Sequence, residues 1–220
     1  MLETKSILKK YPLWFELVTG VLFGVLNSTF STFFGKIGSP IFMDTIFAIT
    51  AAFVGWWSGV VSVLVFAVMS AFKSEPGVRL VSSIFTICVL AMVLIVRLVY
   101  KKRDRVSVLS LFYVYILCVV FVSVIGAIIS TYAFNKFDYP DYNSVRYITM
   151  VFTRQQIPLI FSSFLSRIPV NAIDKLIAVF AGYGLYLGIE KLVFKTKLTI
   201  HESVGVPEAL EGQSKIDDKS

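Results

Sequence analysis

Hydrophobic residues form long runs along this chain, and short polar stretches or groups of glycine and proline separate one run from the next. Residues 80–100 contain a single charged side chain, and residues 106–134 contain none. A helix of either length crosses a hydrocarbon core of about 30 Å. Runs this long with so few charges predict membrane-spanning helices, because the core of a soluble domain is built from shorter apolar segments.

The full pattern predicts an all-α integral membrane protein with six transmembrane helices. The expected spans cover residues 11–34, 40–53, 60–72, 79–100, 106–134 and 169–194. A Gly-Trp-Trp-Ser-Gly sequence separates the second span from the third, and both of these spans are short. The apolar stretch 157–166 is about ten residues long, which is too short to cross. We expect it to be a re-entrant or interfacial segment before the last span.

The spans divide the chain into a basic leader at 1–10, a six-helix membrane domain at 11–197 and a polar tail at 198–220 that is expected to be disordered. Six spans put both termini on one side of the membrane. That side also receives the basic run 101–105 and the lysines that follow the last span. Since short basic loops stay in the cytoplasm, we expect a multi-pass plasma-membrane protein with both termini cytoplasmic.

Composition agrees with the membrane prediction and changes the meaning of the positive charge. Of 220 residues, 56% are hydrophobic and 16% are charged, against about 25% charged in a typical soluble domain. The formal net charge of +7 comes from Lys and Arg clusters beside the apolar spans. Such clusters mark topology and attract anionic headgroups, so membrane lipid is an expected partner and nucleic acid is not.

Residue types needed for common kinds of catalysis are missing from the spans. The one histidine, His201, lies in the polar tail, so we expect no His-ligated metal site and no Ser-His or Cys-His nucleophile in the membrane domain. Cys88 and Cys118 lie within apolar stretches and are expected to be small buried hydrophobes. The sequence has no phosphate-binding loop of the Gly-x-x-x-x-Gly-Lys-Ser/Thr type. We therefore expect no enzyme activity, no cofactor and no metal.

Polar side chains inside or beside two of the expected spans are the candidates for a binding site. Six residues belong to this group: Asp44, Thr45, Arg167, Asn171, Asp174 and Lys175. Asn171, Asp174 and Lys175 share roughly one helical face, because positions three and four apart are neighbours. Both sets lie near the outer ends of their spans, and ionisable residues within a membrane are costly and usually functional. We expect them to line a pocket that opens to the outside.

A structural role is the alternative for these residues. Asp174 and Lys175 would then pair with other helices, or Lys175 would extend to the outer headgroups. Asp44 would neutralise an arginine of the long polar loop and fix helix packing. The two interpretations differ in whether a ligand depends on these side chains.

Two glycines in the first expected span form a separate pattern. Gly20-Val21-Leu22-Phe23-Gly24 places small residues four positions apart. This spacing lets another helix backbone approach closely within a membrane. Gly20 and Gly24 are therefore a candidate docking face.

Two segments of the chain resemble the substrate-binding S components of energy-coupling factor (ECF) transporters. The first is Pro-Ile-Phe-Met-Asp-Thr-Ile at 40–46, followed by Gly-Trp-Trp-Ser-Gly at 55–59. It is similar to the family's Asp-Thr-Ile entry to the second helix and its Gly-Pro-Trp-Trp-Gly turn. The second is Arg-Ile-Pro-Val-Asn-Ala-Ile-Asp-Lys-Leu-Ile at 167–177, which resembles the start of the family's last helix. The chain departs from the family in having Trp56 where proline is expected, and in its long external loop.

The resemblance implies a six-helix protein that binds a vitamin, a precursor or a metal from outside. Such proteins dock on a transmembrane coupling subunit that is attached to two cytoplasmic ATPases. Family members use small residues of the first helix for docking, and Gly20 and Gly24 match that pattern. Metal-transporting members use N-terminal histidines, which this chain lacks, so a small organic solute is implied. The segments 31–39 and 135–167 would cover the pocket.

The function expected from the sequence is thus solute capture for an ECF-type importer, without enzymatic activity. The alternative is a membrane sensor or assembly module that uses the same polar residues to hold helices together or to bind a partner. A stand-alone secondary transporter is a third option. It is weakened by the small size of the chain and by the lack of an evident inverted repeat.

Overall fold

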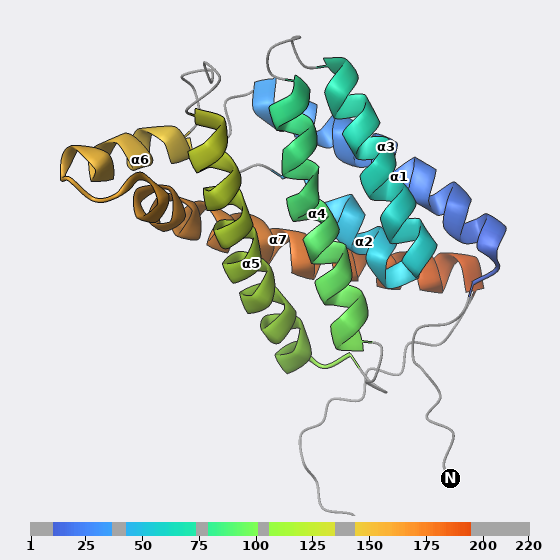
Figure 1. Cartoon of the computed structure of the whole chain (residues 1–220). Helices are drawn as coiled ribbons and strands as arrows, with labels where there is room; N and C mark the ends of the chain where they lie inside the picture. The colour runs from blue at the N-terminus through green and yellow to red at the C-terminus, as the bar shows by residue number, and fades with distance from the viewer. Residues whose placement is uncertain (1–10, 37–42, 74–78, 101–105, 135–143, 195–220) are drawn as a thin grey trace, which may run out of the picture. The chain divides into compact units, whose positions relative to one another are not determined.

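A computed structural model describes residues 11–36, 43–73, 79–100, 106–134 and 144–194. These parts of the chain form seven helices and no strand (Figure 1). The helices are α1 (Leu13–Lys36), α2 (Ile46–Val54), α3 (Trp56–Lys73), α4 (Arg79–Tyr100), α5 (Val108–Phe134), α6 (Ser144–Arg154) and α7 (Leu159–Phe194). Two compact units are distinguished, residues 1–188 and 189–220, and only the end of α7 is described in the second. The all-α prediction is confirmed for the described residues.

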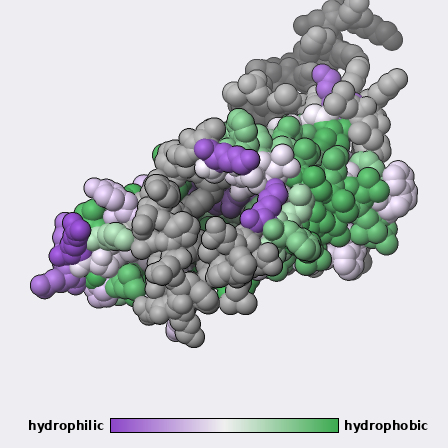
Figure 2. Space-filling model, turned by 90° about the horizontal axis from the view of Figure 1, so that it is seen from above, coloured by the Kyte–Doolittle hydropathy of each residue, from purple (hydrophilic) through white to green (hydrophobic). Residues whose placement is uncertain are grey.

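Five of these helices, α1, α3, α4, α5 and α7, are long and apolar enough to cross a membrane. Many of their large hydrophobic side chains are exposed, including Trp14, Leu64, Leu109 and Ile173. In the view of Figure 2, hydrophobic side chains cover a broad part of the described surface, and hydrophilic ones appear in separate small groups. A soluble protein rarely exposes apolar patches of this size, so the surface is consistent with a multi-pass membrane protein.

The helix expected as the second span is shorter than the sequence pattern indicates. It is α2, with nine residues, of which eight are buried. At 1.5 Å per residue it is about 14 Å long, about half the thickness of a hydrocarbon core. The expected start of this span at 40–42 lies outside the described residues. In the described parts, α2 is an internal helix enclosed by its neighbours rather than a helix that faces lipid.

A single residue, Gly55, separates α2 from α3. Its backbone is extended, which ends α2, and the carboxylate of Glu16 lies directly against it. A Cβ atom at Gly55 would be 2.1 Å from the Glu16 Cδ atom, so a side chain at this position would displace the Glu16 carboxylate. Glu16 also accepts a hydrogen bond of 2.9 Å from the backbone N–H of Trp57, in the first turn of α3. The carboxylate therefore serves one of the amides that a helix N-terminus leaves without an intrahelical partner.

The expected segment 157–166 is not a separate element. Its residues from Leu159 onward form the first turns of α7, which continues through Pro169 to Phe194. It was expected to be separate because ten apolar residues are too short to cross, and the last span was expected to begin at 169. Three serines of this segment, Ser162, Ser163 and Ser166, are fully buried. The helix therefore turns polar side chains inward and apolar ones outward, which a length count of apolar residues does not detect.

The region expected as a long polar loop also contains a helix, α6. It has eleven residues and alternates between a buried side, with Val145 and Thr149, and an exposed side, with Tyr147 and Met150. The hydroxyls of Thr149 and Ser166 lie 2.7 Å apart, which joins α6 to α7. The leader 1–10 and the tail 198–220 lie outside the described residues. The predicted disorder of the tail and the predicted cytoplasmic location of both ends therefore stay predictions.

Helix α3 packs against α1, α2 and α4, while α4 packs in turn against α5. Figure 1 shows α7 crossing behind α4 and α5. Aromatic contacts fix part of this core, since the Phe53 ring of α2 lies 5.4 Å from Tyr100 of α4 and 5.2 Å from Tyr183 of α7. Phe53 is completely buried. The helices thus surround α2, and the residues that precede α2 are carried into the interior.

The two glycines of α1 face α3 of the same chain. A Cβ atom at Gly20 would lie 2.8 Å from the Ser58 carbonyl oxygen, and one at Gly24 would lie 2.6 Å from the Val65 Cβ atom. Both glycines are buried. The close approach that their spacing predicts is therefore made within the chain, and they are covered rather than open to a partner.

Candidate functional site

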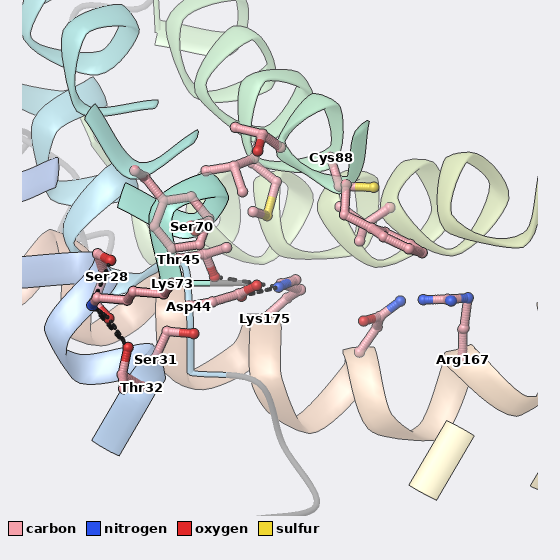
Figure 3. A pocket seen from close by; sticks show the side chains of 17 residues that line it. Ser28, Ser31, Thr32, Asp44, Thr45, Ser70, Lys73, Cys88, Arg167 and Lys175 are labelled. Atoms are coloured by element: carbon pink, nitrogen blue, oxygen red, sulfur yellow. Dashed lines mark hydrogen bonds and ion pairs between the residues drawn. The ribbon is translucent and has the colours of Figure 1, made fainter. Parts of the chain in front are cut away.

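A polar cavity of about 350 Å³ lies among the helices of the first unit. Its lining comes from α1, α3, α4, α5 and α7 and from the residues just before α2 (Figure 3). The charged side chains of the lining are Asp44, Lys73, Arg167 and Lys175. Hydroxyl and amide groups, a thiol and apolar side chains make up the rest. The volume falls at the lower end of the range of small-molecule sites, which is about 300–1,000 Å³.

Lys175 of α7 is the best-enclosed charge of the cavity, with 2% of its surface exposed. Its Nζ atom lies 2.5 Å from Oδ2 of Asp174 and 3.6 Å from Oδ1 of Asp44. It also donates a hydrogen bond of 3.3 Å to the Thr45 hydroxyl. Two carboxylates and a hydroxyl therefore surround one ammonium group, which is the compensation that a buried charge requires.

Asp174 stands behind the cavity rather than in its lining. It is fully buried, and its second oxygen accepts a hydrogen bond of 2.7 Å from the backbone N–H of Met43. Met43 has a positive φ of 49°, which is uncommon for a residue with a side chain. Such a conformation persists where surrounding contacts hold it. Asp174 thus orients both Lys175 and the chain that leads into α2.

The residues before α2 are held from two sides. Asn27 of α1 donates a hydrogen bond to the backbone carbonyl of Asp44. Thr45 is the N-cap of α2, but its hydroxyl makes no capping hydrogen bond and instead accepts one from Lys175. An N-cap threonine normally serves the amides of its own helix. Here the hydroxyl contributes to the cavity instead, and the helix start is positioned by contacts with α1 and α7.

Arg167 and Asn171 of α7 occupy another part of the cavity. The Arg167 guanidinium donates a hydrogen bond to the Ser130 hydroxyl of α5, and its Cζ atom lies 5.2 Å from the centre of the Phe85 ring of α4. This distance is typical of a cation–π contact. Asn171 donates a hydrogen bond of 2.9 Å to the Ser123 hydroxyl, also of α5. The start of α7 is thereby fixed to α5 by two polar contacts.

Lys73, at the end of α3, donates hydrogen bonds to oxygen atoms of α1. Its Nζ atom donates hydrogen bonds to the Ser28 carbonyl oxygen at 3.2 Å, the Ser28 hydroxyl at 3.0 Å and the Thr32 hydroxyl at 2.9 Å. Ser31 and Ser70 line the same part of the cavity. Figure 3 shows Lys73 with Ser28 and Thr32 on one side of Asp44, and Arg167 on the other.

The structure brings together most of the residues that were predicted from the sequence to form a binding site. Five of its six residues, Asp44, Thr45, Arg167, Asn171 and Lys175, line the cavity. Asp174 supports it from behind, as described above. The segment 31–36, which was expected to be part of a covering loop, belongs instead to α1, and Arg167 belongs to α7.

Lys73, Ser28 and Thr32 were missed by the sequence reasoning. Lys73 was assigned to a loop because proline and glycine follow it closely. Ser28 and Thr32 are four positions apart, so they share a face of the first helix, and this spacing was the signal that could have identified them.

The cavity lining combines hydrogen-bonding groups with apolar walls. Among the described residues, no group of three or more His, Cys, Asp or Glu side chains is placed to hold a metal ion. The lining offers ammonium and guanidinium donors, one carboxylate acceptor, hydroxyl groups that act as either, and apolar walls such as Phe66 and Met92. This combination suits a small molecule with polar groups on an apolar body.

Comparisons with known proteins give no independent assignment. No family model, no curated protein and no solved structure matches the chain. The resemblance to S components therefore rests on the two segments of the sequence described above.

Proposed function

We propose that this protein captures a small organic solute from outside the cell as the S component of an ECF-type importer. The observation that carries the proposal is the meeting of the two resembling segments at one cavity. Asp44 and Thr45 come from the first segment, and Arg167, Asn171 and Lys175 come from the second, more than a hundred residues further along the chain. Residues that carry a family resemblance and converge on one polar cavity support a shared ligand-binding role.

The remainder of the proposal concerns topology and partners. The chain would cross the membrane six times, with the short α2 and the residues before it as the second span, and both termini would be cytoplasmic. Transport energy would come from a coupling subunit and its ATPases. Docking on that subunit is expected to involve the exposed face of α1, where Val18, Val21 and Leu22 are uncovered. Gly20 and Gly24 would contribute indirectly, by setting the distance between α1 and α3.

A ligand screen on the purified full-length chain tests the proposal. Melting temperatures are measured in detergent against a panel of vitamins and their precursors. A solute that binds the folded state alone, at about 100 times its dissociation constant, adds about 2.7 kcal/mol of stability. We expect at least one strong stabiliser. A well-folded protein that no solute stabilises would contradict solute capture.

The choice of variant for this screen follows from the structure. Asp44 has 27% of its side chain exposed and lines the cavity, so Asp44→Asn is expected to fold and to lose solute affinity. Asp174 is fully buried and holds Lys175 and the Met43 amide, so Asp174→Asn is expected to lower stability whether or not a ligand exists. Asp44→Asn is therefore the variant that reports on binding.

The second candidate function, a membrane sensor or assembly module, is favoured by one observation. The contact between Asp174 and Lys175 is buried and internally compensated, as in a group that holds helices together. In such a protein, Asp44→Asn would change stability or partner binding with no solute affinity to lose. The same screen thus separates the two functions.

A further inference from the structure

The two carboxylates at the cavity both lie beside the same cation. Lys73, Arg167 and Lys175 are cationic, while Asp44 in the lining and Asp174 behind it are anionic. Both carboxylates contact Lys175. Neither of them is a hydrogen-bond partner of Lys73.

Lys73 is the cation with uncharged partners. In the described parts of the chain, its three hydrogen bonds go to one carbonyl oxygen and two hydroxyl groups. These oxygens satisfy the geometry of the ammonium group but carry no formal negative charge. Lys73 is exposed, so its Nζ atom is accessible to a molecule that enters the cavity. The adjacent hydroxyls of Ser28 and Thr32 can also donate to an anion, because a hydroxyl serves as donor or acceptor.

Asp44 supplies a hydrogen-bond acceptor to the cavity, whereas Lys73 supplies donors. Its Oδ1 atom is buried and has no hydrogen-bond partner among the described residues. Lys175 is 3.6 Å from this oxygen, which is an ion-pair distance but longer than a hydrogen bond. The Asp44 side chain is 27% exposed and lines the cavity, so a ligand N–H or O–H group can reach the carboxylate from the cavity and donate to it.

From this arrangement we propose that the captured solute is an organic anion with a hydrogen-bond donor. Its carboxylate or phosphate group binds Lys73 and the hydroxyls of Ser28 and Thr32, and its donor group binds the carboxylate of Asp44. The inference rests on the proposed function and narrows the class of solute. An anion is favoured at the Lys73 end because the described partners of Lys73 carry no negative charge, and charge-assisted hydrogen bonds are the stronger kind.

Matched pairs of probes test the chemistry of the solute. The acid and amide pair is biotin with biotinamide, which both keep the ureido N–H groups as donors. The phosphate pairs are pyridoxal phosphate with pyridoxal, and thiamine phosphate with thiamine. Each pair differs in the anionic group, so the pairs also separate a carboxylate from a phosphate. Affinities are measured by thermal shift and confirmed by calorimetric titration of the full-length chain in detergent.

A matched set of lysine variants tests the position of the anion. Lys73→Gln removes the proposed contact, Lys73→Arg keeps the charge, and Lys36→Gln removes a positive charge at the end of α1 outside the cavity lining. Hydrogen bonds to charged groups are worth enough that Lys73→Gln should weaken binding of the anionic probe about 10- to 100-fold. Lys36→Gln should change it less than about 3-fold, and Lys73→Arg should fall between the two. Melting temperatures without probe show whether each variant folds.

The outcomes separate this inference from the proposed function. The proposed function and this inference are both supported if an anionic probe binds, its uncharged partner binds more weakly, and Lys73→Gln weakens binding of the anionic probe. Binding of an uncharged or cationic probe in preference to its anionic partner leaves the proposed function intact and overturns the inference. Binding of an anionic probe that is equal in Lys73→Gln and Lys36→Gln overturns the assignment of Lys73. If no probe of either kind binds the folded protein, both proposals are contradicted.

Discussion

Loss of the Asp174 carboxylate is expected to be among the most damaging single changes to the fold. Asp174 is fully buried, its oxygens contact Lys175 at 2.5 Å and the Met43 amide at 2.7 Å, and Lys175 is itself 2% exposed. Removing one partner of a buried ion pair costs about 3–5 kcal/mol, because the other charge remains buried without compensation. In Asp174→Asn, Asp44 still lies 3.6 Å from Lys175, so we expect the lower end, about 3 kcal/mol.

The assay is the melting temperature of the purified chain in detergent, with Asp44→Asn as the control. For a chain of this length, each kcal/mol shifts the melting temperature by about 2–4 °C, so Asp174→Asn should lower it by about 6–12 °C. Asp44 is partly exposed and more distant from Lys175, and its loss should cost about 1 kcal/mol or less.

A second change makes the cause of this loss testable. Lys175→Met should also destabilise, because it leaves Asp174 buried without its cation. The double variant Asp174→Asn with Lys175→Met should then be more stable than the sum of the single losses predicts, by about 0.5–3 kcal/mol. Equal, small effects of Asp174→Asn and Asp44→Asn would refute the reasoning, since they would mean that the buried pair does not hold the fold.

Two further predictions concern packing and access. Gly24→Ala should lower stability by about 1–3 kcal/mol, because its Cβ atom would lie 2.6 Å from that of Val65. The control is Gly35→Ala on the same helix, which meets nothing within 4 Å and should be neutral or slightly stabilising. Comparable melting temperatures for the two variants would contradict the close contact of α1 with α3. Cys88 lines the cavity and Cys118 is completely buried, so a small thiol reagent should label Cys88 first in mass spectrometry of the intact protein, and a bound solute should slow that labelling. Faster labelling of Cys118 would contradict the placement of the cavity.

Element positions could be predicted from the sequence where a span is long and mostly apolar and ends at a clear signal. The fourth span was expected at 79–100, and α4 has these bounds, because Pro76 and Gly77 precede it and a basic run follows it. The fifth span differs from α5 by two residues at its start. Here hydrophobicity, length and flanking charge all indicate the same boundaries.

The same reasoning was wrong where helices bury polar residues against one another. The stretch 157–166 was interpreted as a separate apolar segment too short to cross, although from Leu159 onward it is the start of α7 and buries three serines, Ser162, Ser163 and Ser166. The length of α2 was also missed, because an internal helix next to other helices reads as an apolar run whether or not it faces lipid. Hydrophobicity along a sequence does not distinguish contact with lipid from contact with protein.

The candidate site was predictable in part for a physical reason. Charged residues within apolar runs are costly in a membrane and therefore indicate function, and this rule identified Asp44, Asp174 and Lys175. The same rule does not identify Lys73 and its hydroxyl partners, because a lysine at the end of a span is an ordinary feature and serine is tolerated in membrane helices. Only the packing of α1 against α3 brings Lys73 to Ser28 and Thr32.

The central claim, that the cavity captures a solute, is tested most directly by equilibrium titration of the purified full-length protein. The solute to use is the strongest stabiliser from the panel, and Asp44→Asn is measured beside the wild-type chain. Solute capture predicts saturable binding of one solute per chain that is at least about 10-fold weaker in Asp44→Asn, as expected for loss of a charged hydrogen-bond acceptor. Unsaturable binding, or equal affinity of the two folded proteins, would contradict the claim.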